Sequence, residues 1–178
     1  MEIIAGVGVE AVRIGEVRGE VERRLGRPVH ARDDSRALAR RAVYDAADPV
    51  LVVTYDREDV VELVEVSYGL DDQVFFEGVQ LTYRFMDEVI ADLAANGHPS
   101  TPSDIGFDVP AGCAIFSMAS LSARDLDPAA PEEDSRRVVE GVSIAPYSYF
   151  TADKPPLNGT IEELETWLRQ RGVLPTES

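Results

Sequence analysis

The sequence EVRGEVERRLG at residues 16–26 follows the pair Gly8-Val9, and MDEVIADLAANG at residues 86–97 follows Gly78-Val79 in the same order. Each stretch is an acid-led, amphipathic helical pattern that ends at a glycine, and strand-rich sequence comes after it. An internal sequence repeat of this kind is typical of a fold that arose by duplication. We therefore expect an α+β fold in which two tandem α/β repeats, about residues 1–70 and 71–150, form one curved antiparallel sheet with the helices packed on one face.

Two helices follow from the spacing of apolar residues, one over residues 16–25 and one over residues 86–95. Apolar positions three or four residues apart make one stripe on a helix. Gly26 and the following Pro28 end the first helix, and Asn96-Gly97 ends the second. The stripes are Val17, Val21 and Leu25 in the first helix and Val89, Ile90 and Leu93 in the second.

A further helix is expected at the C-terminal end, over about residues 160–171. Thr160 and Glu163 have the spacing of a capping box, in which each side chain bonds the other residue's backbone N–H. The apolar stripe of this helix is Leu164, Trp167 and Leu168.

Strands are predicted from β-branched runs and from alternation of apolar and polar residues. Residues 51–55 and 60–68 form a hairpin, and residues 79–85 alternate as a strand with one covered face. The segment 34–41 is ambiguous between helix and loop, and the acidic stretch 125–134 is a polar loop whose role the sequence leaves open. Other strands are predicted at residues 42–45, 106–109, 114–118 and 137–145.

The 178 residues are expected to form one domain, and their formal charge is uneven. Residues 1–50 hold nine arginines and nine acids and are neutral, whereas residues 51–178 hold eight basic and twenty-four acidic residues, which gives the whole −16. A surface of this sign repels nucleic acid and anionic membranes. The charge serves solubility alone or steers a basic partner, and the sequence leaves both alternatives open.

The single cysteine, Cys113, excludes an internal disulfide framework, and its apolar surroundings indicate a small buried hydrophobe. The first residues do not resemble a signal peptide, and no window approaches the length of a membrane span. We therefore expect a cytoplasmic protein.

Catalytic and metal-binding patterns are absent from the sequence. His30 and His98 have no partner at ligand spacing, and neither a nucleophile elbow nor a phosphate-binding glycine loop occurs. The acid pairs Asp33-Asp34, Asp71-Asp72 and Asp125-x-Asp127 lack the pattern of an EF-hand. We expect no catalytic residues, no metal and no cofactor.

The repeated order of features resembles the β-lactamase inhibitor protein-like fold, in which two helix-plus-sheet units lie in tandem. The resemblance rests on residues 15–17, 20–21 and 25–28 and on the degenerate copy at Glu88-Val89, Leu93 and Gly97. It covers about residues 6–150 and implies a protein that binds other proteins on its sheet face. The chain has no paired cysteines, so a secreted β-lactamase is not implied as the partner. It also resembles a set of actinobacterial proteins.

Four aromatic residues give the sequence's binding-site hypothesis: Tyr83 and Phe85 on one predicted strand face, and Tyr147 and Tyr149 after Pro146. Tyrosine is rigid and amphipathic and suits interfaces. We expect a non-enzymatic protein-binding module, of an immunity-type or inhibitor-like kind, that acts on a basic protein partner. The alternative is a small-ligand-binding protein or enzyme with a pocket between sheet and helices. Homodimerisation through an uncovered face or edge stays open.

Overall fold

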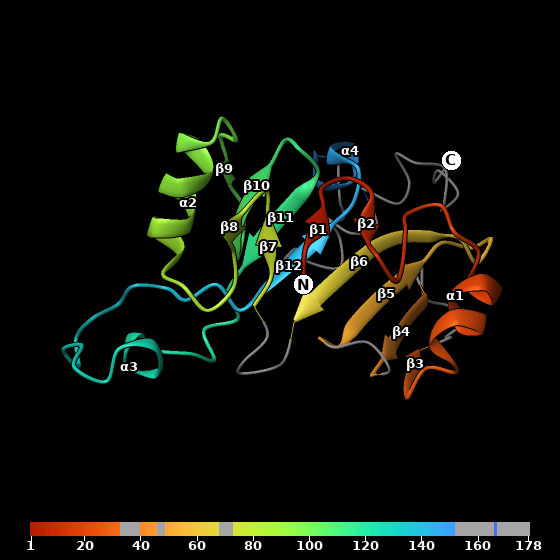
Figure 1. The fold of residues 1–178 in the computed structure, drawn as a ribbon, viewed down its shortest axis with the longest axis horizontal. Helices are drawn as coiled ribbons and strands as arrows, with labels where there is room; N and C mark the ends of the chain where they lie inside the picture. The colour runs from red at the N-terminus through yellow and green to blue at the C-terminus, as the bar shows by residue number, and fades with distance from the viewer. Residues whose placement is uncertain (33–39, 46–48, 68–72, 152–165, 167–178) are drawn as a thin grey trace.

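The computed structural model describes residues 1–32, 40–45, 49–67, 73–151 and residue 166 (Figure 1). Its helices are α1 (Arg18–Leu25), α2 (Met86–Ala95), α3 (Ala123–Leu126) and α4 (Tyr147–Thr151). Its strands are β1 (Ile3–Ile4), β2 (Gly8–Val9), β3 (His30–Arg32), β4 (Arg40–Tyr44), β5 (Leu51–Tyr55), β6 (Val61–Ser67), β7 (Phe75–Phe76), β8 (Val79–Gln80), β9 (Thr101–Pro102), β10 (Gly106–Val109), β11 (Cys113–Phe116) and β12 (Gly141–Ile144).

Eight of these strands form one antiparallel sheet in the order β3-β4-β5-β6-β12-β11-β10-β9. Strands β6 and β12 pair at its centre, and β3 and β9 are its two edges, so the sheet is not closed. The pairs β1-β2 and β7-β8 are separate hairpins. In Figure 1, α1 lies beside β3–β5 and α2 lies on the far side of the molecule beside β8–β10. The α+β class and the antiparallel sheet agree with the prediction.

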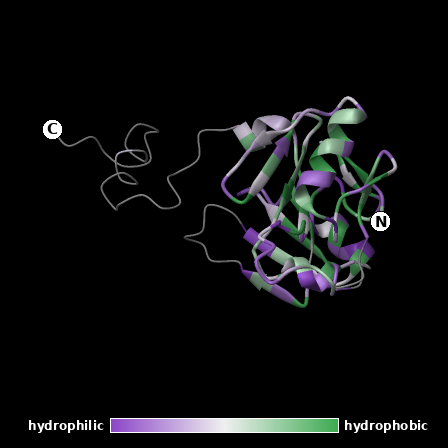
Figure 2. Ribbon diagram, turned by 90° about the vertical axis from the view of Figure 1, so that its left-hand side faces the viewer, coloured by the Kyte–Doolittle hydropathy of each residue, from purple (hydrophilic) through white to green (hydrophobic). Residues whose placement is uncertain are grey.

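The core lies on one face of this sheet. Side chains alternate between the faces of a strand, and directly opposed core residues cross six strands with 0% exposure each: Ala42, Val53, Val64, Ile144, Cys113 and Val109. Val21 of α1 and Val89 and Leu93 of α2 pack into the same cluster. In Figure 2 many of the hydrophobic positions accordingly lie in the interior of the described part of the structure.

Helix α2 has the predicted bounds, but α1 begins two residues later than predicted. Val17 is not part of the buried stripe, because it is extended at the helix start and is 47% exposed. Its backbone instead forms an isolated antiparallel bridge with Val60. The structure thus confirms Val21 as a core residue of α1 and corrects Val17.

The strand predicted over residues 79–85 is wrong beyond Gln80. Leu81 and Thr82 are both buried, which a strand with one open face does not allow. Thr82 Oγ1 accepts a hydrogen bond from the N–H of Val74 (2.9 Å), and Tyr83 has a φ of 54°. These interactions turn the chain out of the hairpin and into α2.

The remaining predicted strands are present in the structure, most of them with shifted bounds. The hairpin of residues 51–55 and 60–68 is β5 with β6, and residues 106–109 are β10. The strand predicted at 42–45 is Arg40–Tyr44, the one at 114–118 is Cys113–Phe116, and the one at 137–145 is only Gly141–Ile144. Asp125 and Leu126, predicted in the loop, belong to α3.

Two predicted segments lie outside the described residues. These are the ambiguous stretch up to residue 39 and the C-terminal helix at 160–171, of which only Thr166 is described, and Thr166 is helical. In the described part of the chain, every helix is too short or too polar to cross a membrane.

An apolar hollow on the open sheet face

The face of the sheet opposite α1 and α2, here called the open face, carries a second set of aligned residues. One row of directly opposed residues crosses all eight strands there: His30, Val43, Val52, Glu65, Ser143, Ala114, Asp108 and Thr101. Because opposed residues in a sheet point to the same side, hydrogen-bond register alone brings together residues that are far apart in sequence. The row mixes apolar and charged side chains, as expected of a face that is only partly covered.

Helix α4 covers part of this face and leaves a hollow of about 480 Å³ beside it, here called the α4 hollow. Most of its lining is apolar, from the strands below, from the loop before β10 and from α4. The lining residues are Leu63, Pro102, Ser103, Asp104, Ile105, Asp108, Ala114, Ile115, Phe116, Ser143, Tyr149 and Phe150. The rings of Tyr149 and Phe150 meet edge to face with centroids 5.8 Å apart.

The titratable groups near Tyr149 give this part of the face a negative character. Burial, with Glu62 and Glu65 nearby, raises the pKa of the Tyr149 phenol to about 12. The phenol is therefore protonated at neutral pH and can donate a hydrogen bond, but it is no base. Burial also raises the pKa of Glu65, against the effect of Arg41, whose guanidinium lies 2.7 Å from the carboxylate. Asp104 and Asp108 add two further carboxylates to the lining of the hollow.

Glu140 fixes the loop 117–121, which in turn supports Ile105 in the wall of the α4 hollow. Its Oε1 accepts hydrogen bonds from Ser117 Oγ (3.1 Å) and from the N–H groups of Ser120 (3.0 Å) and Leu121 (3.3 Å), and Ser120 Oγ donates to Oε2. The N–H of Ser117 in turn donates to the carbonyl of Ile105 (3.0 Å). Partial burial favours the neutral acid, but these hydrogen bonds together lower the pKa of Glu140.

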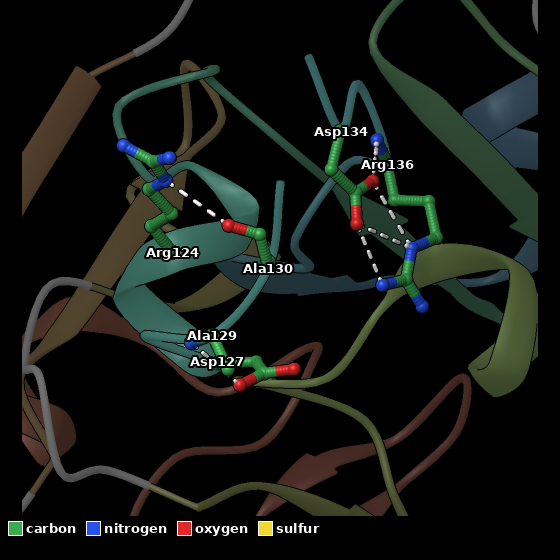
Figure 3. Close-up of polar contacts among 6 residues, drawn as sticks. All are labelled: Arg124, Asp127, Ala129, Ala130, Asp134 and Arg136. Carbon is green, nitrogen blue, oxygen red and sulfur yellow. Dashed lines mark hydrogen bonds and ion pairs between the residues drawn. The ribbon is translucent and has the colours of Figure 1, made fainter. Parts of the chain in front are cut away.

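The acidic stretch 125–134 is anchored by two flanking arginines, Arg124 and Arg136 (Figure 3). Arg136 donates to both carboxylate oxygens of Asp134, at 2.7 to 3.1 Å, and its guanidinium lies 3.7 Å from the centroid of the Phe85 ring. Arg124 Nε donates to the carbonyl of Ala130 (3.1 Å). Arg136 therefore joins this loop to the start of α2 through an ion pair and a cation–π contact.

The structure separates the four aromatic residues of the sequence hypothesis. Phe85 is buried as the residue before α2, in a small cluster with Ala123, Ala130 and Val138. Tyr83 lies beside it outside any strand, so the two do not share a strand face. Tyr147 is half-buried in α4 and does not line the hollow, whereas Tyr149 does. Among the four, Tyr149 alone belongs to the α4 hollow.

Sequence reasoning missed Ile105, Phe116 and Asp108. The run CAIF in β11 is apolar at every position, so alternation could not indicate that Phe116 faces the open side. Ile105 is an isolated apolar residue after the polar stretch 99–104, which was the signal available in the sequence. In the structure its side chain is 47% exposed.

The other candidate groups that the structure describes make contacts within the fold or lie at its surface, and the pairs Asp33-Asp34 and Asp71-Asp72 lie outside the described residues. Cys113 is buried as predicted, and burial raises its pKa to about 12. His98 Nε2 lies 2.9 Å from Glu77 Oε2, and its ring contacts Phe76, while His30 is an exposed edge residue. Asp125 caps α3 through Ser122, and Asp127 accepts the N–H of Ala129. No group of three or more potential metal ligands occurs within the described ranges.

Comparisons of the chain with protein-family models, with curated proteins and with solved structures found no significant match.

Proposed function

We propose that this chain is a non-enzymatic protein-binding module whose α4 hollow receives an apolar side chain of a protein partner. The observation that carries the proposal is the hollow of about 480 Å³ with its apolar lining on an open sheet face. An exposed apolar depression rimmed by polar groups is typical of interaction sites. Anchors in such pockets contribute most of the affinity at interfaces.

Charge favours a basic partner. Asp104 and Asp108 line the hollow, Glu62 and Glu65 lie near Tyr149, and the chain as a whole carries −16. A partner with arginine or lysine around its apolar anchor would be attracted to this face, and its association would slow with added salt. Nucleic acid would be repelled. An immunity-type or inhibitor-like protein, acting in the cytoplasm, has this requirement for a specific basic partner.

We also propose that the chain is a tandem duplication of the β-lactamase inhibitor protein-like kind, with one curved sheet. Each half runs in the order hairpin, helix and four sheet strands, and the halves join through their last strands, β6 and β12. Val17 before α1 bridges to Val60 before β6, and Phe85 before α2 bridges to Val138 in the segment before β12. The same contact at the same place in both halves supports duplication over coincidence.

A matched pair of isoleucines tests the binding proposal. Ile105 lines the hollow at 47% exposure, and Ile4, in the hairpin on the opposite side of the sheet, is 49% exposed. Extracts of the native host would be passed over the wild-type chain, Ile105→Asp and Ile4→Asp, and the retained protein would then be purified and its Kd measured by calorimetry. We expect Ile105→Asp to weaken binding and Ile4→Asp to bind like wild type. Equal binding by both variants, or no retained protein, would refute the proposal. If the hollow instead binds a second copy of this chain, the molecular mass in solution would rise with protein concentration.

The second candidate function, a small-ligand-binding protein or enzyme, is favoured by the volume of the hollow. Cavities that bind small molecules measure about 300–1,000 Å³, and Tyr149 with Asp108 would supply polar contacts. Tyr149→Phe should then lower the affinity for a ligand found by thermal-shift screening and leave the affinity for a protein partner largely unchanged. A screen without any stabilising compound counts against this candidate.

A further inference from the structure

A second hollow, of about 400 Å³, lies on the same open face over the first strands of the sheet, here called the β3–β5 hollow. Its lining consists of apolar residues and basic residues. Val43, Val50 and Val52 form an apolar floor, and the charged or titratable lining residues within the described ranges are basic: His30, Arg32 and Arg41. Arg41 is also paired with Glu65 of β6 at 2.7 Å. These basic groups belong to residues 1–50, the neutral part of a chain whose net charge is −16. The combination suits an amphipathic segment that presents apolar and acidic side chains together.

The chain itself contains such a segment after α4, the last described helix on the open face. Arg41 of the hollow lies close enough to Tyr149 of α4 to act on the pKa of its phenol, and α4 ends at Thr151. The helix predicted over residues 160–171 has Leu164, Trp167 and Leu168 on one stripe. Within it, Thr166 is helical and exposed.

Charge and reach both favour this occupant. The predicted helix carries Glu162, Glu163 and Glu165 near its start, opposite in sign to the basic lining, whereas Asp104 and Asp108 would repel them from the α4 hollow. The connection over residues 152–159 can span about 26–29 Å when extended. A point two or three strands away across a sheet is about 10–15 Å distant, and this is the distance that the connection has to span. The linker is therefore long enough.

We propose that the C-terminal segment of residues 160–171 docks in the β3–β5 hollow of its own chain, with Trp167 and its flanking leucines on the valine floor and the glutamates beside His30, Arg32 and Arg41. The segment then completes the open face, and the α4 hollow stays accessible beside it.

Trp167 is the only tryptophan of the chain, so tryptophan emission, excited selectively over that of the six tyrosines, reports on this segment alone. In the full-length protein we expect emission at the short wavelengths of a buried indole and weak quenching by acrylamide. Val43→Glu and Arg32→Glu should each shift the emission to longer wavelength and raise quenching toward that of the urea-unfolded chain. Circular dichroism would check that each variant is folded. Arg32→Glu changes an exposed side chain and should therefore leave the sheet intact. Ile105→Asp, in the other hollow, should leave the emission unchanged.

Cross-linking locates the contact. Val50→Cys with Leu168→Cys should form an intramolecular disulfide on mild oxidation, and Ile105→Cys with Leu168→Cys should not; Cys113 is buried and does not compete. The proposal is overturned by wild-type emission like that of the unfolded chain, by equal cross-linking of both pairs, or by disulfides between two molecules, which would mean that a second copy fills the hollow. Because Ile105→Asp tests partner binding and Val43→Glu tests the tail, the two proposals fail separately.

Discussion

Replacing Glu140 by alanine should destabilise the protein and loosen one wall of the α4 hollow. The carboxylate is half-buried and accepts four hydrogen bonds, two from hydroxyl groups and two from backbone N–H groups of the loop 117–121. Hydrogen bonds to a charged group contribute about 1.5–3 kcal/mol each when buried. Water can replace some of them here, because Ser120 is exposed and Leu121 is only half-buried. We therefore expect a total loss of about 2 kcal/mol, or a fall in Tm of about 4–8 °C for a chain of this size.

The loss should depend on pH in a defined direction. The pKa of Glu140 is lowered in the folded chain, so the unfolded chain binds the proton more readily. The stabilisation by this carboxylate is therefore fully present above the pKa of the unfolded chain and is lost as the pH falls through the lower pKa of the folded chain. The difference in free energy of unfolding between wild type and Glu140→Ala should shrink as the pH is lowered below about 4.3, the ordinary pKa of glutamate.

Urea unfolding at a series of pH values measures this difference. Glu133→Ala, at an exposed position of the preceding loop, is the matched control and should stay near wild type. Ser120→Ala combined with Glu140→Ala should cost less than the sum of the single changes, because the two side chains share a hydrogen bond. A difference that stays constant from neutral pH down to acid pH, or a Glu140→Ala variant as stable as wild type, would refute this account.

Two further predictions concern backbone packing and the thiol. A Cβ at Gly112 would lie 2.5 Å from Gly6 Cα at a φ of +107°, so Gly112→Ala should lower the free energy of unfolding by more than 2 kcal/mol, roughly the upper cost of backbone strain together with a clash. Gly19→Ala, in α1 with open space around it, should instead raise it by about 0.5–1 kcal/mol in the same urea titration, and the reverse order would contradict the packing. Cys113 should react with a thiol reagent only as fast as the chain unfolds, because it is fully buried and its pKa is raised to about 12; rapid reaction with one thiol per native chain would disprove its burial.

Local sequence patterns were sufficient where one short segment decides its own structure. The apolar spacing in residues 86–95 fixes a helix whose bounds the structure reproduces, and the β-branched run at 51–55 with its turn fixes the hairpin with β6. The same logic failed at residues 79–85. The residue types alternate through Phe85, but the strand ends at Gln80 and Thr82 accepts a hydrogen bond from the N–H of Val74, eight residues earlier. A side chain that ends a strand by bonding an earlier segment leaves no periodic signal.

The sequence by itself determined the α+β class, helix α2, the β5-β6 hairpin, the burial of Cys113 and the strongly negative charge, since each depends on composition or on neighbours within a few residues. Only the tertiary structure decided which side chains share the open face. Residues from His30 to Ser143 align there because eight antiparallel strands have one hydrogen-bond register, and a shift of one residue in any strand would turn its side chains to the other face.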